Sequence, residues 1–238
     1  MYEIIFAIIL AYLGTRRALP HSIRKLRENN YLAKDMYKKN TPRVPTNGGI
    51  IILFVSYITI SLMPLISRII NRLGLLDYNF SDYTEVSLAL VLVVSIYGLY
   101  GLVDDLVDIG RWSKLFLPVI FGLPLISVSY PEEFWFPFIG EITLKQEIMF
   151  GLYREDFFKI LIIPMYVMVV SNLVNMHSGY NGLQTGLSII LISTLITRSI
   201  MDNEYDNILP AGAFLGSLIA FYSYNSFPSK VFEGNIGS

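Results

Sequence analysis

The sequence has no cysteine among its 238 residues, and charged residues make up only 16% of it. Without cysteine, the chain can form neither a disulfide framework nor a thiolate metal site. The net charge of −1 provides no basic excess of the kind that binds nucleic acid. The chain also lacks internal repeats and low-complexity segments. We therefore expect no disulfide-stabilised domain, no cysteine zinc site and no nucleic-acid partner.

The sequence is rich in apolar residues. Apolar residues make up 53% of the chain, and its mean hydropathy is +0.52. This composition is typical of a multi-spanning membrane protein rather than a soluble domain. We predict an all-α fold, in which residues 1–238 form a single integral-membrane domain built as a transmembrane helical bundle.

Seven apolar runs are long enough to be considered as membrane spans. They are Ile4–Leu13 with flanks to Leu19, Gly48–Ile70, Val86–Val103, Leu115–Val128, Ile160–Val174, Leu183–Ile200 and Ile208–Tyr224. Pro118 and Pro124 are expected to kink the fourth span without ending it. The first run lacks a basic leader and a small-residue cleavage site, which favours a retained span over a signal peptide.

The segments between the spans differ in character. Residues 16–43 are polar and basic and are predicted to form a loop with a short surface helix. Residues 130–156 are rich in Phe, Trp, Glu and Pro and resemble an interfacial loop with aromatic anchors. Both segments therefore lie outside the predicted spans.

Lysine and arginine are distributed unevenly across the predicted membrane. With the N-terminus outside, 12 of the 18 basic residues fall on the cytosolic side, nine of them in residues 16–43. The positive-inside rule therefore favours an outside N-terminus and an inside C-terminus. This topology gathers the polar motifs at the cytosolic face of the cell membrane, or of the endoplasmic reticulum membrane in a eukaryotic cell.

Three aspartates end the third apolar run, at Asp104, Asp105 and Asp108. Asp104 and Asp108 share a helix face, where like charges repel, and the C-terminal helix dipole disfavours anions. A bound magnesium ion would remove both penalties, whereas the simpler interpretation is three solvated acids. Lys114 follows six residues later, as either a phosphate contact or a positive-inside anchor.

An amide-rich segment ends the fifth run. Asn172 and Asn175 share a helix face and suit either bonds between helices or magnesium ligation. The following turn, Asn181-Gly182, can present side-chain and backbone groups to a nucleobase or a sugar. His177, between them, is interpreted as an interfacial histidine rather than a ligand.

Two further segments are rich in glycine. Gly48 and Gly49 open the second run, where they permit the close approach of another backbone, a packed helix or an anionic ligand. The polar C-terminal segment, residues 227–238, taken by itself has the character of a tail.

Four motifs, taken together, carry a family resemblance. They are Pro45-Thr46-x-Gly48-Gly49, Gly101-x-x-Asp104-Asp105, Asn172-x-x-Asn175 through Asn181-Gly182-Leu183, and Pro228-Ser229-Lys230-Val231-Phe232-x-Gly234. In this order they resemble the polyprenyl-phosphate N-acetylhexosamine-1-phosphate transferases of the glycosyltransferase 4 type. Residues 111–118 and 175–182 look closer to the dolichyl-phosphate GlcNAc-1-phosphate transferase branch than to the cell-wall branch.

The resemblance implies an activity. Members of this family transfer a sugar 1-phosphate from a UDP-sugar to a membrane polyprenyl phosphate at the cytosolic face, with magnesium as cofactor and UMP as product. The resemblance thus implies UDP-GlcNAc and a dolichyl-type lipid phosphate as substrates, in the first step of lipid-linked oligosaccharide assembly. It also implies Mg²⁺, with Mn²⁺ as a substitute, and it leaves a homodimer open.

The same resemblance implies roles for individual residues. Asp104, Asp105 and Lys114 would be catalytic: Asp104 would orient or deprotonate the lipid phosphate, Asp105 would support the metal site, and Lys114 would contact phosphate oxygens. Asn175 and Asn235 would ligate the metal. Substrate-binding roles would fall to Gly48, Gly49, Asn172, Asn181 and Gly182.

The chain departs from the family pattern in two ways. Asn235 stands where the family has an aspartate, which removes one negative charge from the expected metal site. The chain also ends inside the last motif and is expected to be truncated at its C-terminus. Two alternatives stay open: an inactive family member or partner subunit, and a membrane transporter, although transporter sites usually lie near the bilayer midplane.

Overall fold

A computed structural model gives the fold. It describes residues 2–36, 38–74, 87–107, 109–128, 130, 132–136, 138, 140–149, 151–177, 179–203, 205 and 207–237. The predicted acidic residue Asp108 lies outside the described residues, as does Val86 at the predicted start of the third span. The side chain of His177 is also outside them.

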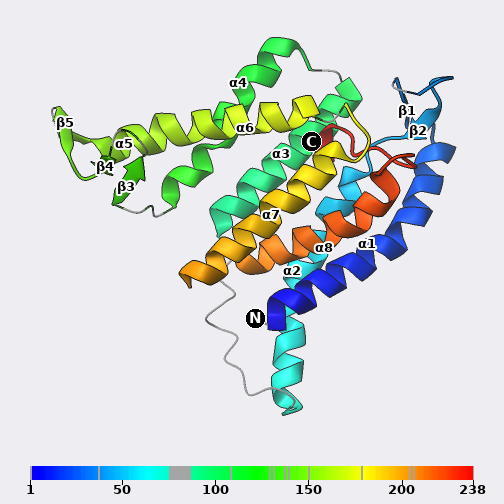
Figure 1. Cartoon of the computed structure of the whole chain (residues 1–238), viewed down its shortest axis with the longest axis horizontal. Coiled ribbons are helices and arrows are strands. Elements are labelled where there is room, and N and C mark those ends of the chain that lie inside the picture. The colour runs from blue at the N-terminus through cyan, green and yellow to red at the C-terminus, as the bar shows by residue number, and fades with distance from the viewer. Residues whose placement is uncertain are drawn as a thin grey trace. The chain divides into compact units, whose positions relative to one another are not determined.

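Helices form most of the described chain (Figure 1). Six of the described helices, α1, α2, α3, α6, α7 and α8, have 15 residues or more and carry the long apolar runs, and α4 and α5 are shorter. A π-helical stretch, Phe158–Ile162, links α5 to α6. The α-helices are α1 Tyr2–Glu28, α2 Gly49–Arg72, α3 Leu88–Val107, α4 Arg111–Phe121, α5 Arg154–Phe157, α6 Ile163–His177, α7 Leu183–Asp202 and α8 Ile208–Asn225.

Within the described residues, three short antiparallel hairpins add to the predicted all-α fold. They pair β1 (Leu32–Lys34) with β2 (Arg43–Pro45), β3 (Glu133–Phe136) with β4 (Gly140–Thr143), and β5 (Glu147–Met149) with β6 (Leu152–Tyr153). Strands of two to four residues are too short to show an alternating apolar pattern, so no sequence pattern predicts them. The helical class holds, and both predicted loops contain strands.

Four helices are long and apolar enough to cross a membrane among the described residues. They lie at Gly49–Arg72, Leu88–Val107, Arg154–Met176 and Leu183–Asp202, and a shorter apolar helical stretch runs over Trp112–Ser127. The predicted count of seven spans and the outside N-terminus are not established by these helices and stay predictions.

Helix α1 is longer than predicted. Residues 16–28 are predicted to lie in a loop with a short surface helix, but α1 continues through Pro20 to Glu28. Packing explains the difference: Thr15 and Leu19 are fully buried, and α1 lies alongside α8 (Figure 1). The lost amide hydrogen bond at Pro20 is thus offset by burial along the helix.

The fourth predicted span is also different. The α-helix α4 ends at Phe121, and residues Leu123–Ser127 form a 3₁₀ turn. The prediction that Pro124 kinks this span without ending it is therefore wrong, because the α-helix ends before Pro124. A Cβ on Gly122, between the two, would lie 3.0 Å from the Cα of Pro164. The close approach of α6 at this point accompanies the end of α4.

The chain forms two compact units. One comprises residues 1–86, 98–107 and 174–238, and the other residues 87–97 and 108–173, in each case as far as they are described. In the first unit α1 and α8 pack very closely, because a Cβ on Gly216 would lie 2.1 Å from the carbonyl oxygen of Ile8. In the second, the Tyr97 hydroxyl donates a 3.1 Å hydrogen bond to the Pro118 carbonyl.

Candidate active site

Two predicted site residues meet the C-terminal segment at the end of α3. The side-chain amide of Asn235 donates to Oδ2 of Asp104 over 2.7 Å. The backbone N–H of Asn235 is shared between the two carboxylate oxygens of Asp105, at 3.2 and 3.1 Å. Asp104 is buried and Asp105 half-buried. Residues 130 positions apart therefore form one carboxylate–amide cluster, defined here as Asp104, Asp105 and Asn235.

Glycines allow the C-terminal segment to reach α3 and α2. A Cβ on Gly101 would lie 2.4 Å from the carbonyl oxygen of Asn235, and one on Gly49 would lie 2.4 Å from the Cα of Gly237. Both distances are too short for any side chain. Gly101 and Gly49 are thus required for the backbone to approach the cluster.

The start of α2 holds the same segment by main-chain hydrogen bonds. Gly48 N–H donates to the Phe232 carbonyl at 2.9 Å, and Gly49 N–H donates to the Glu233 carbonyl at 2.8 Å. Phe232 N–H donates in turn to the Pro45 carbonyl at 2.8 Å. The predicted close approach at Gly48 and Gly49 is therefore made by protein backbone, and these two amides, which were candidates for an anion, bind carbonyl oxygens.

A buried polar network supports the segment from α7 and α8. Asn225 donates to Oε2 of Glu233 over 2.7 Å and to the Val231 carbonyl over 3.0 Å, and it accepts a hydrogen bond from Thr185 over 2.9 Å. Gln184 donates to the Gly237 carbonyl over 2.8 Å. The network thus fixes the segment on either side of Asn235.

Glu233 is 4% exposed, and its Oε1 atom has no hydrogen-bond partner among the described residues. Burial raises the pKa of this carboxyl above its ordinary value of 4.5, although hydrogen bonds from its own backbone, Asn225 and Thr185 act in the opposite direction. Sequence reasoning missed Glu233, Asn225 and Thr185. A polar residue near the end of an apolar helix, such as Asn225, is the only signal that pointed to this network.

Asn181 and Gly182, the predicted nucleotide-binding turn, contact other parts of the same unit. The Asn181 side-chain amide donates to Oδ2 of Asp35 over 3.1 Å, and Lys38 forms an ion pair with the same oxygen at 2.7 Å. Gly182 has a φ of 76° and lies close to Ser226. Asp35, which is 2% exposed, therefore ties this turn to the β1–β2 hairpin.

The remaining predicted residues, Asn172, Asn175 and Lys114, lie on α6 and α4. Asn172 donates to the Met168 carbonyl of its own helix over 2.9 Å, so it does not use its amide between helices in this arrangement. Asn175 is exposed near the end of α6. Lys114 lies in the first turn of α4 and, like Asn172, belongs to the second unit.

The cluster suits a hard cation by its chemistry. Within the part of the chain that the structure describes, no three His, Asp or Glu side chains are gathered as a metal site. Two carboxylates and one amide nevertheless offer the oxygen donors that Mg²⁺ prefers. Asn235 also stabilises Asp104 and Asp105 without a cation. The cluster therefore matches Mg²⁺ in the type of its donor atoms, but it carries less negative charge than a site with an aspartate at position 235.

The helices and the cluster define a helical membrane protein with a carboxylate site at a helix end. The profile of glycosyl transferase family 4 matches residues 87–238, and the chain belongs to this family. The match includes Asp104, Asp105 and Asn235.

Curated relatives agree with this assignment. The chain is 30% identical over 219 residues to a protein of Saccharolobus solfataricus provisionally named a UDP-N-acetylglucosamine–dolichyl-phosphate N-acetylglucosaminephosphotransferase; the match covers 91% of the chain and 61% of the relative. A protein of Sulfolobus acidocaldarius with the same provisional name is 28% identical, over 99% of the chain and 67% of the relative. The phospho-N-acetylmuramoyl-pentapeptide-transferase of Streptococcus mutans is 28% identical, over 98% and 68%. The chain thus spans about two thirds of the length of these relatives.

Proposed function

We propose that the protein transfers N-acetylglucosamine 1-phosphate from UDP-GlcNAc to a membrane polyprenyl phosphate of the dolichyl type. The products would be GlcNAc-pyrophosphoryl-polyprenol and UMP. The observation that carries the proposal is the cluster of Asp104, Asp105 and Asn235 within a chain of glycosyl transferase family 4. The names of the relatives support the substrate class.

The proposed reaction is a phosphoryl transfer. An oxygen of the lipid phosphate attacks the β-phosphorus of UDP-GlcNAc, and the bond from that phosphorus to the bridging oxygen breaks as UMP leaves. The lipid phosphate is itself the nucleophile, so the protein contributes position and charge stabilisation. One balanced step forms and breaks one phosphorus–oxygen bond.

Asp104 is proposed to orient or deprotonate the lipid phosphate. Its burial and its hydrogen bond from Asn235 fix the carboxylate in one direction. Asp105 is proposed to support the charge of the site, since the Asn235 N–H holds both of its oxygens. Gly49 and Gly101 act by admitting the C-terminal segment, and Gly48 by holding it.

Mg²⁺ is the cation proposed for this site, with Mn²⁺ as a substitute. Asp105 and Asn235 would hold it together with Asn175, and it would neutralise charge on the transferred phosphate. Lys114 is proposed to contact phosphate oxygens, and Asn172, Asn181 and Gly182 to shape the nucleotide site. The site is proposed to face the cytosol.

The test is a transfer assay on the full-length protein. Labelled UDP-GlcNAc, dolichyl phosphate and Mg²⁺ are incubated with the wild type, Asp104→Asn, Asp105→Asn and the control Asp202→Asn, whose carboxylate pairs with Arg198 on α7. We expect lipid-linked label with the wild type and the control, and a loss on the order of 10²-fold or more with either site variant.

Two results would contradict the proposal. Absence of lipid-linked label with the natural full-length wild type would favour an inactive relative or a partner subunit. Equal activity of Asp105→Asn and the Asp202→Asn control would remove the cluster from the reaction while leaving the family assignment intact.

A further inference from the structure

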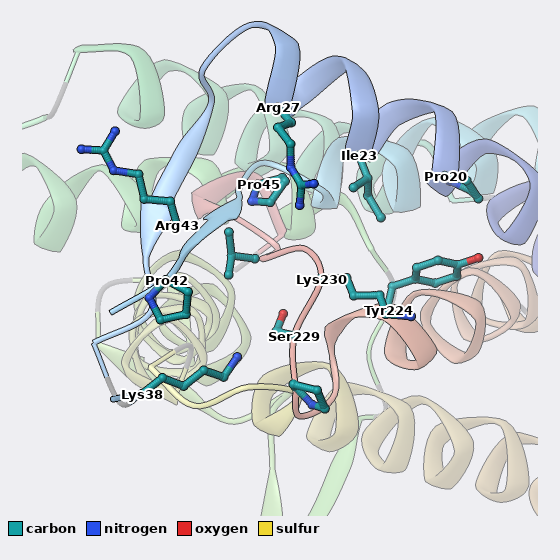
Figure 2. Close-up of a pocket in the computed structure, with 12 residues that line it drawn as sticks. Pro20, Ile23, Arg27, Lys38, Pro42, Arg43, Pro45, Tyr224, Ser229 and Lys230 are labelled. Atoms are coloured by element: carbon teal, nitrogen blue, oxygen red, sulfur yellow. The ribbon is translucent and has the colours of Figure 1, made fainter. Parts of the chain in front are cut away.

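A second polar site lies in the first unit, where the last turns of α1, strand β2 and residues 228–230 meet. It is a pocket of about 560 Å³, a size typical of small-ligand sites. Figure 2 shows Arg27 and Lys38 reaching into the space between α1, the β1–β2 hairpin and the segment of Ser229 and Lys230. None of Asp104, Asp105 and Asn235 lines it, so the pocket is separate from the cluster.

The charge of the pocket has one sign. None of its described lining residues is acidic. The four cationic lining residues are Arg27, Lys38, Arg43 and Lys230. Lys38 pairs with the buried Asp35, which is not among the described lining residues. Arg27, Arg43 and Lys230 have no carboxylate partner among the described residues. Three cations without a carboxylate partner therefore border one hollow, with the Arg43 guanidinium pointing away from the other labelled side chains (Figure 2).

The remaining lining is mostly apolar. Pro20 and Ile23 come from α1, Val44 and Pro45 from β2, and Tyr224 from the last turn of α8. Lys230 also lies over the Tyr224 ring, 5.8 Å from its centroid. An apolar wall next to cations matches a ligand with an anionic head and an apolar body.

If α1 crosses the membrane as the sequence predicts, the pocket would lie near the membrane interface. Tyr2–Leu19, the part of α1 before Pro20, rises about 27 Å at 1.5 Å per residue, close to the ~30 Å hydrocarbon core. The lining residues of α1 begin directly after this length, and a tyrosine ends α8 beside them, as is usual at interfaces.

We propose that this pocket binds the phosphate headgroup of one anionic bilayer phospholipid. Cationic pockets between helices at the cytosolic interface attract such headgroups, with each Lys or Arg contributing measurably. The bilayer lipid is favoured over the polyprenyl phosphate substrate because the lining excludes the carboxylate–amide cluster. The proposal is independent of the transfer reaction.

The test measures lipid retention by native mass spectrometry of the delipidated full-length protein. The probes are phosphatidylglycerol, phosphatidylcholine, a polyprenyl phosphate and inorganic phosphate. The test variants are Arg27→Gln/Lys230→Gln and Arg43→Gln/Lys230→Gln. The control is Arg17→Gln/Arg24→Gln, which removes two exposed charges from α1 outside the pocket lining. The charge swap Arg27→Lys/Lys230→Arg separates charge from folding.

We expect the wild type, the control and the charge swap to prefer phosphatidylglycerol over phosphatidylcholine. Each test variant should bind phosphatidylglycerol about 25-fold more weakly, or about fivefold per lost cation. Equal retention of the two phospholipids by the wild type, or equal loss in the control, would overturn the proposal. Preferential retention of polyprenyl phosphate, or displacement of the lipid by inorganic phosphate, would also overturn it by assigning another ligand.

Discussion

Asn235 donates its side-chain amide to Asp104 over 2.7 Å, in a contact that needs no cation. An aspartate at position 235 would place two carboxylates at this distance, where they repel unless a proton or a cation separates them. The asparagine therefore stabilises the cluster in the absence of metal and lowers the charge available to bind one.

Asn235→Asp should consequently make the stability of the protein dependent on divalent cations. When a chelator removes divalent cations, we expect the free energy of unfolding of the variant to be about 1–3 kcal/mol lower than that of the wild type, because the hydrogen bond is broken and a charge is added. In Mg²⁺, the variant should bind the cation on the order of tenfold more tightly than the wild type, because affinity rises with ligand charge. Thermal unfolding against Mg²⁺ concentration measures both effects. Asn30→Asp, at an exposed position with φ 61°, is the control, and an equal response there would contradict the interpretation.

Gly101→Ala should displace the C-terminal segment from α3. Its Cβ would lie 2.4 Å from the Asn235 carbonyl oxygen, whereas the Cβ of the matched variant Gly98→Ala would lie 2.9 Å from a terminal methyl of Leu53, which can rotate away. We expect Gly101→Ala to lose about 1–3 kcal/mol of stability and most transfer activity, and Gly98→Ala to stay close to wild type. Unfolding curves and transfer rates compare the two, and similar values for both would show that the close approach at Gly101 is unimportant.

Asp35 and Asn181 should be energetically coupled. Asp35→Ala removes the buried acceptor of both Asn181 and Lys38 and should cost about 2 kcal/mol. In a double-mutant cycle with Asn181→Ala, we expect a coupling energy of about 1 kcal/mol. Additive single and double variants would mean that the hydrogen bond between hairpin and turn contributes nothing.

Glu233 should give the protein a pH dependence. Burial raises the pKa of this carboxyl in the folded state, so above pH 4.5 the unfolded chain releases a proton that the folded chain still holds. Its contribution to folding free energy is therefore full below the ordinary pKa and is lost as the pH rises through the raised value. Glu233→Gln, which has no proton to release, should show a flatter unfolding temperature from pH 4.5 upward. An unchanged slope would contradict this.

Sequence reasoning reached the cluster because its members carry chemistry of their own. Asp104 and Asp105 are costly at the end of an apolar run, and Asn235 lies in a recognisable motif, so their meeting could be anticipated. The close approach at Gly49 was also predictable, since two glycines at a helix start have few other uses. The structure adds that protein backbone makes this approach.

Other features depend on packing that leaves no local pattern. The continuation of α1 through Pro20 is explained by burial against α8, and the β1–β2 hairpin has strands of three residues. In the sequence, Glu233 is a single charged residue in a polar C-terminal segment, with no pattern that indicates burial. Its hydrogen bond from Asn225 is seen only in the fold. Tertiary contacts, rather than propensity, decide each of these cases.

The central claim is that the natural full-length protein transfers a sugar phosphate rather than a sugar. The nucleotide product separates the two reactions, because cleavage at the β-phosphorus releases UMP and cleavage at the sugar carbon releases UDP. We predict one UMP for each molecule of lipid-linked GlcNAc in the presence of dolichyl phosphate and Mg²⁺, and UMP formation reduced on the order of 10²-fold or more with Asp105→Asn. Release of UDP with the lipid product, or UMP formation that is unchanged in Asp105→Asn, would contradict the account.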